Sequence, residues 1–188
     1  MNHNSVYAIV VSEGQALQIE ESLTKAGFSN DEISALIPDK DLTSKFPSNV
    51  EPNGSYAKTG GVLGAALDLL ASIGMLSIPG VGRVVAAGPL FVSLSAIAAA
   101  GATAFGIAGA LVGLGIPEMA ATRYETRIAG GNILLSVHTE TPERLRKAKE
   151  VLEFANAEDI AVGVMLENRI AIDMAFNQGG GANHHTAG

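Results

Sequence analysis

The hydrophobic pattern at the start of the chain predicts a strand, a helix and a second strand. Residues 6–11 are apolar and mostly β-branched, which is typical of a buried strand. Ser12 and Gln15 have the three-residue spacing of a helix capping box. The apolar residues that follow recur on one helix face: Ala16, Ile19, Leu23 and Ala26. Gly27 ends this helix and residues 33–37 form another apolar strand, so this part of the chain predicts a βαβ unit.

The second half of the chain repeats the pattern after an additional helix. That helix begins at Pro117, because proline is favoured in the first helical turn, and ends before a glycine pair. Residues 133–137 and 160–165 read as strands, and Thr141 before a proline is a helix N-cap between them. The helix face has the spacing seen in the first unit: Leu145, Ala148, Leu152 and Ala155. Alternating residues at 170–174 predict a further edge strand.

The two units predict an α+β fold, a ferredoxin-like sandwich of two βαβ halves. Residues 6–31 and 133–158 cover equal lengths of equivalent pattern. Right-handed crossovers place both helices on one face of the sheet, and two such units that pair edge to edge give the ferredoxin-like arrangement. The expected organisation is a discontinuous domain, residues 1–55 and 117–176, with an insertion at 56–116 and a disordered tail at 177–188.

The insertion is an apolar, glycine-rich stretch with almost no charge. Between Asp68 and Glu118 the single charged residue is Arg83, and 12 of the 22 glycines lie in residues 60–117. Loops face water, so a stretch of this composition must be buried in a bilayer, in an oligomer or against the rest of the chain.

The pattern of the insertion favours a helical hairpin. Residues 60–77 are long enough for a helix of about 27 Å, and residues 90–115 for one of about 39 Å. Glycine and proline at 78–82 and 88–89 separate the two helices. Small residues spaced four apart allow helix backbones to approach closely. The predicted oligomer or membrane interface is Gly60, Gly64, Asp68, Ala98, Ala102, Gly106, Gly109, Ala110 and Gly113.

The length of the second helix favours a transmembrane helix, since a hydrocarbon core is about 30 Å thick. Asp68 opposes this interpretation, because a carboxylate at the bilayer centre costs roughly 2.5–3.5 kcal/mol. Arg83 at the tip of the hairpin would also have to cross the bilayer or stay at its surface. The alternative is a hairpin buried in a soluble homo-oligomer.

The amino-acid composition limits the kinds of binding partner and the cellular compartment that we expect. The net charge of −7 and the lack of a basic patch argue against a nucleic-acid partner. The chain has no cysteine, which excludes disulfides and thiolate chemistry. Residues 1–5 have no signal-peptide pattern. We therefore expect a cytoplasmic protein, either a soluble oligomer or one on the cytoplasmic side of the inner membrane.

Candidate chemical sites are few. His138 ends a predicted strand, and His184 with His185 lies in the tail, but metal sites need more converging ligands. Residues 12–14 read as a helix cap, and residues 58–61 lack the order of a phosphate-binding loop. Asp68 and Arg83 would lie more than about 20 Å apart on a straight helix. We expect no catalytic, cofactor-binding or metal residues, and no enzyme activity.

Several motifs together resemble a known family. They are TGGVLG at 59–64, IPGVG at 78–82, AAGP at 86–89, GLGIPE at 113–118, YE at 124–125 and GG at 130–131. This pattern is similar to the bacterial general stress protein 17M family, also called heat-induced stress protein YflT-like. The resemblance covers roughly residues 1–165 and implies a bacterial, stress-related protein. No catalytic or ligand residues are assigned in that family, so the resemblance implies none here.

The sequence thus predicts a non-enzymatic, stress-related protein that oligomerises or associates with a membrane through its glycine-rich hairpin. The alternative is a soluble homo-oligomeric module that senses a small molecule at its strand–helix loops.

Overall fold

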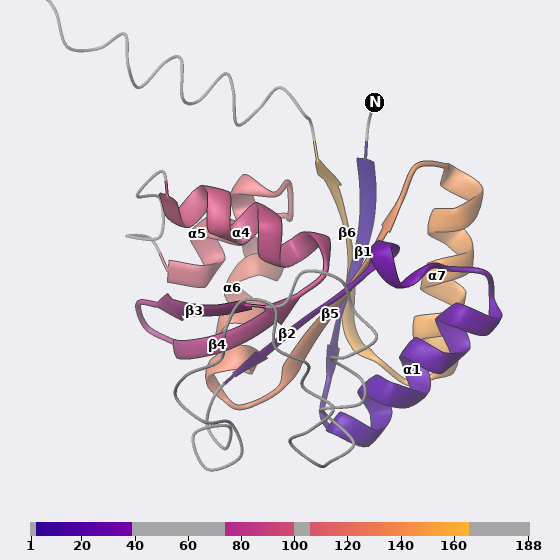
Figure 1. Ribbon diagram of the computed structural model, residues 1–188, viewed down its shortest axis with the longest axis horizontal. Coiled ribbons are helices and arrows are strands. Elements are labelled where there is room, and N and C mark those ends of the chain that lie inside the picture. Colours follow the sequence, from indigo (N-terminus) through magenta and orange to yellow (C-terminus); the bar gives the residue numbers. More distant parts are fainter. Residues whose placement is uncertain (1–2, 39–73, 100–105, 166–188) are drawn as a thin grey trace, which may run out of the picture.

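The fold is α+β, with a six-stranded antiparallel sheet and helices on both of its faces (Figure 1). The computed structural model describes residues 3–38, 74–99 and 106–165. The strand order is β3-β4-β2-β5-β1-β6. The elements are β1 (His3–Val10), α1 (Glu13–Lys25), the short 3₁₀ helix η1 (Asn30–Glu32), β2 (Ile33–Pro38), β3 (Gly74–Ile78), β4 (Gly82–Ala87), α4 (Pro89–Ala99), α5 (Gly106–Gly113), α6 (Glu118–Ala129), β5 (Ile133–Thr139), α7 (Pro142–Phe154) and β6 (Glu158–Met165).

The strands and helices predicted for the two halves are present, and side-chain caps fix α1 and α7. Ser12 accepts a hydrogen bond from the Gln15 N–H, and Thr141 accepts one from the Arg144 N–H. Gln15 also joins the units, because its Nε2 donates to the carbonyls of Ala155 and Asn156 after α7. The sequence correctly predicted these elements and the reading of residues 12–14 as a helix cap.

The sheet separates two hydrophobic cores, because alternate residues of each strand face opposite sides. On one side the strands pack against α1 and α7, with Ile19, Leu23, Ala148 and Leu152 buried. On the other side they pack against α4, α5 and α6 (Figure 1). The buried helix residues of this second core are Leu90, Leu94, Ile97, Ile107, Ala110, Leu111, Ala120, Ala121, Tyr124 and Ile128. The apolar insertion thus covers a sheet face that α1 and α7 leave uncovered.

The start of the insertion's described part is a β-hairpin, so the prediction of a helix over residues 60–77 is wrong for residues 74–77. β3 and β4 pair antiparallel from Gly74 opposite Ala86 to Ile78 opposite Gly82. Pro79 and Gly80 form the turn, in which the Val81 N–H donates to the Ile78 carbonyl at 3.2 Å and Gly80 has φ +84°. Proline followed by a glycine at positive φ is the signature of a type II turn.

The predicted long helix over residues 90–115 is also wrong, because α4 and α5 are separate helices. Among the described residues no helix is long and apolar enough to cross a bilayer, which overturns the predicted transmembrane helix. α4 has 11 residues, about 16 Å at 1.5 Å per residue, against a hydrocarbon core of about 30 Å. Gly106, at the start of α5, has φ +73°, a left-handed conformation that a continuous α-helix does not contain.

Several sequence predictions lie outside the described residues. They concern Gly60, Gly64, Asp68, Ala102, residues 58–61, the edge strand at 170–174 and the tail with His184 and His185.

Candidate functional site

The small residues predicted as an interface lie partly inside the chain. Gly106 and Ala110 are buried where α5 packs against α6. A Cβ at Gly106 would overlap the Glu125 carboxylate of α6. Gly113 is exposed, and a Cβ there would only touch Ile97 at an ordinary 3.8 Å. The close approach that Gly106 permits is therefore within one chain.

Two further members of the predicted interface lie within the described residues. Gly109 is half-buried on α5, and Ala98 lies in the last turn of α4. Their role in an oligomer stays a prediction.

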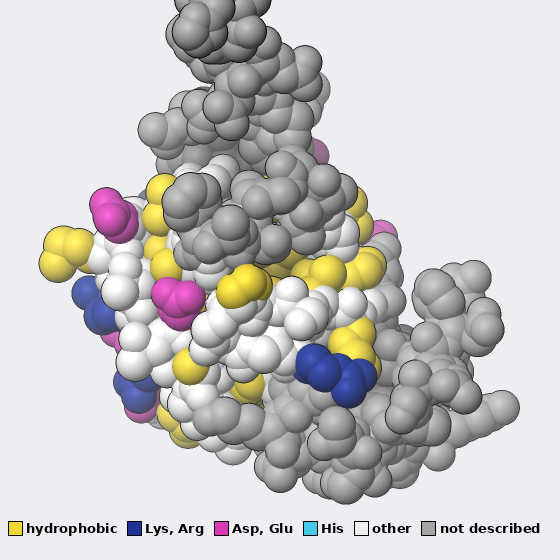
Figure 2. All heavy atoms as spheres, turned by 90° about the vertical axis from the view of Figure 1, so that its left-hand side faces the viewer, with side chains coloured by type: hydrophobic (Ala, Val, Ile, Leu, Met, Phe, Trp, Pro, Cys, Tyr) yellow, Lys and Arg dark blue, Asp and Glu magenta, His cyan; other side chains and the backbone are white. Residues whose placement is uncertain are grey.

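The outer side of α4 and α5 is apolar and carries no charged side chain. We call this the uncharged face, with exposed Val92, Ala96 and Val112 as its residues. Val92 is 57% exposed and Val112 37% exposed. Neither helix has a charged side chain, and Figure 2 shows hydrophobic side chains on this side of the molecule among backbone and other uncharged side chains, with a basic side chain next to them. Exposed apolar side chains gathered on one face are typical of an interaction surface.

Arg83, on β4, is the one charged residue of the stretch from 74 to 117. Its Nη2 lies 2.7 Å from the sulfur of Met75 on the neighbouring strand. Asp68, which the sequence analysis considered as a partner for Arg83, lies outside the described residues.

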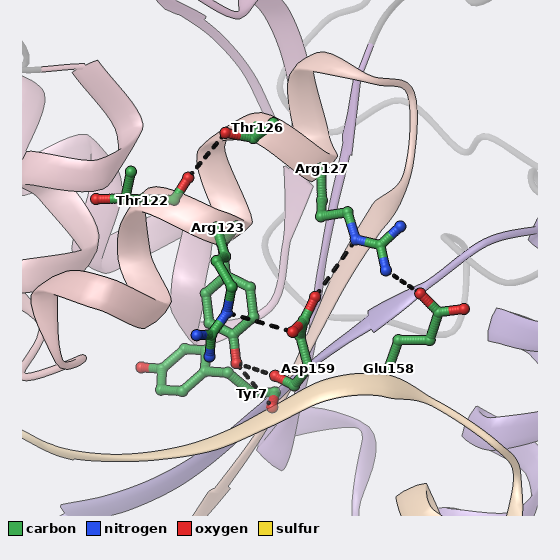
Figure 3. A network of polar contacts seen from close by, with 8 residues as sticks. Tyr7, Thr122, Arg123, Thr126, Arg127, Glu158 and Asp159 are labelled. Atoms are coloured by element: carbon green, nitrogen blue, oxygen red, sulfur yellow. Dashed lines mark hydrogen bonds and ion pairs between the residues drawn. The ribbon is translucent and has the colours of Figure 1, made fainter.

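The opposite edge strand of the sheet, β6, begins with two charged residues, Glu158 and Asp159. Figure 3 shows Arg123 and Arg127 reaching from α6 toward Asp159. Nε of each arginine lies 3.3 Å from a carboxylate oxygen of Asp159, and Arg127 also pairs with Glu158. These pairs are partly exposed, so each is worth little in stability, but together they keep charge along this edge.

A backbone irregularity turns Asp159 toward the arginines. The pairing of β1 with β6 shifts register between Tyr7 and Ile9, and Asp159 has φ +50°. Such a bulge bends the strand and redirects a side chain. The Tyr124 hydroxyl holds the bulge by donating toward the carbonyls of Asp159 at 2.6 Å and Tyr7 at 3.2 Å. Burial, with the Asp159 charge, raises the pKa of Tyr124 above its usual value, so it stays a neutral donor.

A second polar cluster lies on the sheet face beneath α4, around His138. Ser5 Oγ lies 2.9 Å from its Nδ1, and Ser34 Oγ and Ser136 Oγ lie 3.1 and 3.2 Å from its Nε2. The first residues of α4 join the cluster, because the Leu90 N–H donates to Ser34 Oγ. Hydroxyl groups thus meet both ring nitrogens, as buried polar groups require.

The members of this cluster are shielded from water. His138 is half-buried, and the three serines are buried. The serines carry no motif, but each interrupts an apolar strand on the same face of the sheet. Within the described residues no three His, Asp or Glu side chains converge as a metal site would.

Two of the buried ionisable side chains among the described residues, Glu20 and Tyr7, lie on opposite sides of the sheet. Burial raises the pKa of Glu20 on α1 to about 7, and its Oε1 has no hydrogen-bond partner among the described residues. Burial also raises the pKa of Tyr7 to about 12, which the Ser5 hydroxyl opposes in part. Glu20 lies on a helix that covers one face of the sheet, and Tyr7 belongs to the core of the other face. They therefore form no acid–base pair.

This chain matches no protein-family model, no curated protein and no solved structure. The resemblance to the general stress protein 17M family accordingly stays a prediction from the motifs.

Proposed function

We propose that this protein is a non-enzymatic module that associates with copies of itself through the uncharged face. The observation that carries the proposal is the exposure of Val92 and Val112 on two helices that contain no charged residue. Interfaces are depleted in charge at their centre and enriched in apolar side chains.

The lack of charge on α4 and α5 favours a second copy of the chain as the occupant. The chain carries −7 overall, so two copies repel each other in other orientations. Two uncharged faces meet without this local repulsion and remove apolar surface from water. Salt screens the remaining repulsion, so self-association should strengthen as salt rises.

The proposed architecture explains why an insertion is needed. Strands β2-β5-β1-β6, with α1 and α7 on one face, have the order of a ferredoxin-like sandwich, which leaves one sheet face bare. β3, β4, α4 and α5 extend that sheet and help to cover its bare face. Their outer side then becomes a new surface that the two βαβ units alone do not offer.

The alternative of a small-molecule sensor has less support. Its expected place is a strand–helix loop, and at the first such loop the Ser12 hydroxyl and the Gln15 amide are both engaged in capping. The link to stress rests on the motif resemblance alone.

Sedimentation velocity of the full chain tests the proposal. Val92→Glu and Val112→Glu add a charge to the face and should shift the protein from oligomer to monomer. Phe154→Glu, at a residue 91% exposed at the end of α7 on the other side of the sheet, is the matched control and should leave the oligomer unchanged. A wild-type chain that is monomeric at high salt and high concentration would refute the proposal.

A further inference from the structure

We propose that the β3 strands of two copies pair antiparallel across a two-fold axis near Leu76, joining two six-stranded sheets into one. This inference rests on the proposed self-association and names its geometry.

The two edge strands of the sheet differ in the features that prevent pairing with a further strand. Among the described strands, β3 pairs with β4 alone and β6 pairs with β1 alone. β6 carries Glu158, Asp159 and a bulge, features by which proteins protect an edge from further pairing. β3 carries the sequence GMLSI, which has no charge, no proline and no bulge in its pairing with β4. An edge of this kind is a template for another strand.

β3 is also already fixed in the extended conformation that pairing with another strand requires. The register with β4 is continuous over five pairs, and the turn at Pro79 and Gly80 closes the hairpin. On the α4 side, the Phe91 ring lies so close to Gly74 that a Cβ there would overlap it. A strand already fixed in extended form loses little conformational freedom when a partner strand adds to it.

The strand is suited to a second copy of itself. In an antiparallel pair centred on Leu76, Met75 of one copy lies opposite Ser77 of the other. Both side chains are exposed and uncharged, so the directly opposite residues carry no like charges. The nearest charged group of each copy is Arg83, whose Nη2 lies 2.7 Å from the sulfur of Met75. The uncharged helices next to each edge come together at the same axis.

This register can be read with single cysteines, because the chain has none of its own. Directly opposite residues in an antiparallel pair have Cα atoms about 4.5–5.5 Å apart, within the range of about 4.4–6.8 Å that a disulfide spans. Two copies of Met75 would be two positions out of register and too far apart to bridge.

The experiment oxidises full-length Met75→Cys, Ser77→Cys and an equal mixture of the two with oxidised glutathione, and measures covalent dimer on a non-reducing gel. Val162→Cys, on the exposed side of β6, is the edge control. We expect several-fold more covalent dimer in the mixture than in either variant alone, and only background dimer for Val162→Cys. Sedimentation velocity of each reduced variant shows whether the non-covalent oligomer is intact.

The outcomes separate this inference from the proposed function. Reduced variants that remain oligomeric but show no excess cross-link in the mixture would overturn the β3 pairing while leaving self-association standing. Strong dimer in Met75→Cys alone would also overturn it, because that result indicates a parallel or shifted pairing. Cross-linking confined to Val162→Cys would assign the contact to β6. A wild-type chain and reduced variants that are all monomeric would refute both proposals.

Discussion

Replacing Glu20 with glutamine tests whether a buried carboxyl group makes the stability of this fold depend on pH. Glu20 is 5% exposed on α1, and burial raises its pKa from 4.5 to about 7. The folded state therefore binds the proton more tightly than the unfolded state does. The stability that this provides is fully present below pH 4.5 and is lost as the pH rises through about 7.

The size of the effect follows from the shift in pKa. One pKa unit corresponds to about 1.4 kcal/mol, so the full shift would be worth roughly 3 kcal/mol. Relaxation and water access near a helix surface reduce such values, and we expect about 1–2 kcal/mol. Glutamine has nearly the same shape and no charge. Glu20→Gln should therefore stabilise the protein by about 1–2 kcal/mol at pH 8 and change it little at pH 4.5.

Urea unfolding of the full chain at several pH values between 4.5 and 8, with the wild type and the variant side by side, measures this difference. Glu21→Gln is the matched control on the next residue, since Glu21 is exposed and paired with Lys25, which lowers its pKa. It should not reproduce the stabilisation at pH 8. Parallel stability curves for wild type and Glu20→Gln across this range would refute the reasoning.

Two further substitutions test close contacts around α6. Gly106→Ala should destabilise the fold by about 1–3 kcal/mol in thermal unfolding, because it places a Cβ at positive φ and against Glu125. The control Gly113→Ala, in the open last turn of the same helix, should be neutral or slightly stabilising. Equal effects at the two glycines would contradict this reasoning. Tyr124→Phe removes the hydroxyl that holds the β6 bulge and should cost about 1–2 kcal/mol, with faster amide hydrogen exchange around Asp159; unchanged exchange there would show that the bulge does not need it.

The flanking units could be predicted from sequence because their signals are local. Ser12 and Thr141 cap their helices through contacts within a few residues, and the apolar faces of α1 and α7 follow the helical period. The placement of α1 and α7 on the same face of the sheet follows from the right-handed crossovers. Neither inference needs knowledge of what covers the other face of the sheet.

The structure of the insertion was predicted incorrectly because nearly all of its residues are apolar, so the sequence shows no helical periodicity there. α4 and α5 are apolar on nearly every side, so the residues that face the sheet do not stand out from those that face outward. The Pro79–Gly80 pair between two short apolar runs was the available signal for a hairpin. A proline–glycine pair also ends helices, so it does not by itself distinguish a β-turn from the connection between two helices.

The His138 cluster could not be predicted from the sequence for a different reason. Ser5, Ser34 and Ser136 lie in three strands and meet only through the register of the sheet. A one-residue shift in any strand would send that serine to the other face. Sequence periodicity places each residue on a face, but it does not fix which residues stand opposite each other.

The order of the strands has a consequence for how the chain folds. β1 and β5 are neighbours in the sheet although Asn4 pairs with Thr139, which lies 135 residues away. Closing a loop of this length has an entropic cost before any contact rewards it, and folds dominated by such distant pairs form slowly. Until β1, β2 and β5 have met, α4 and α5 have no sheet face to cover, and the newly made chain exposes its least charged segment to other chains. Slow assembly of the sheet therefore sets how long this segment is open to aggregation.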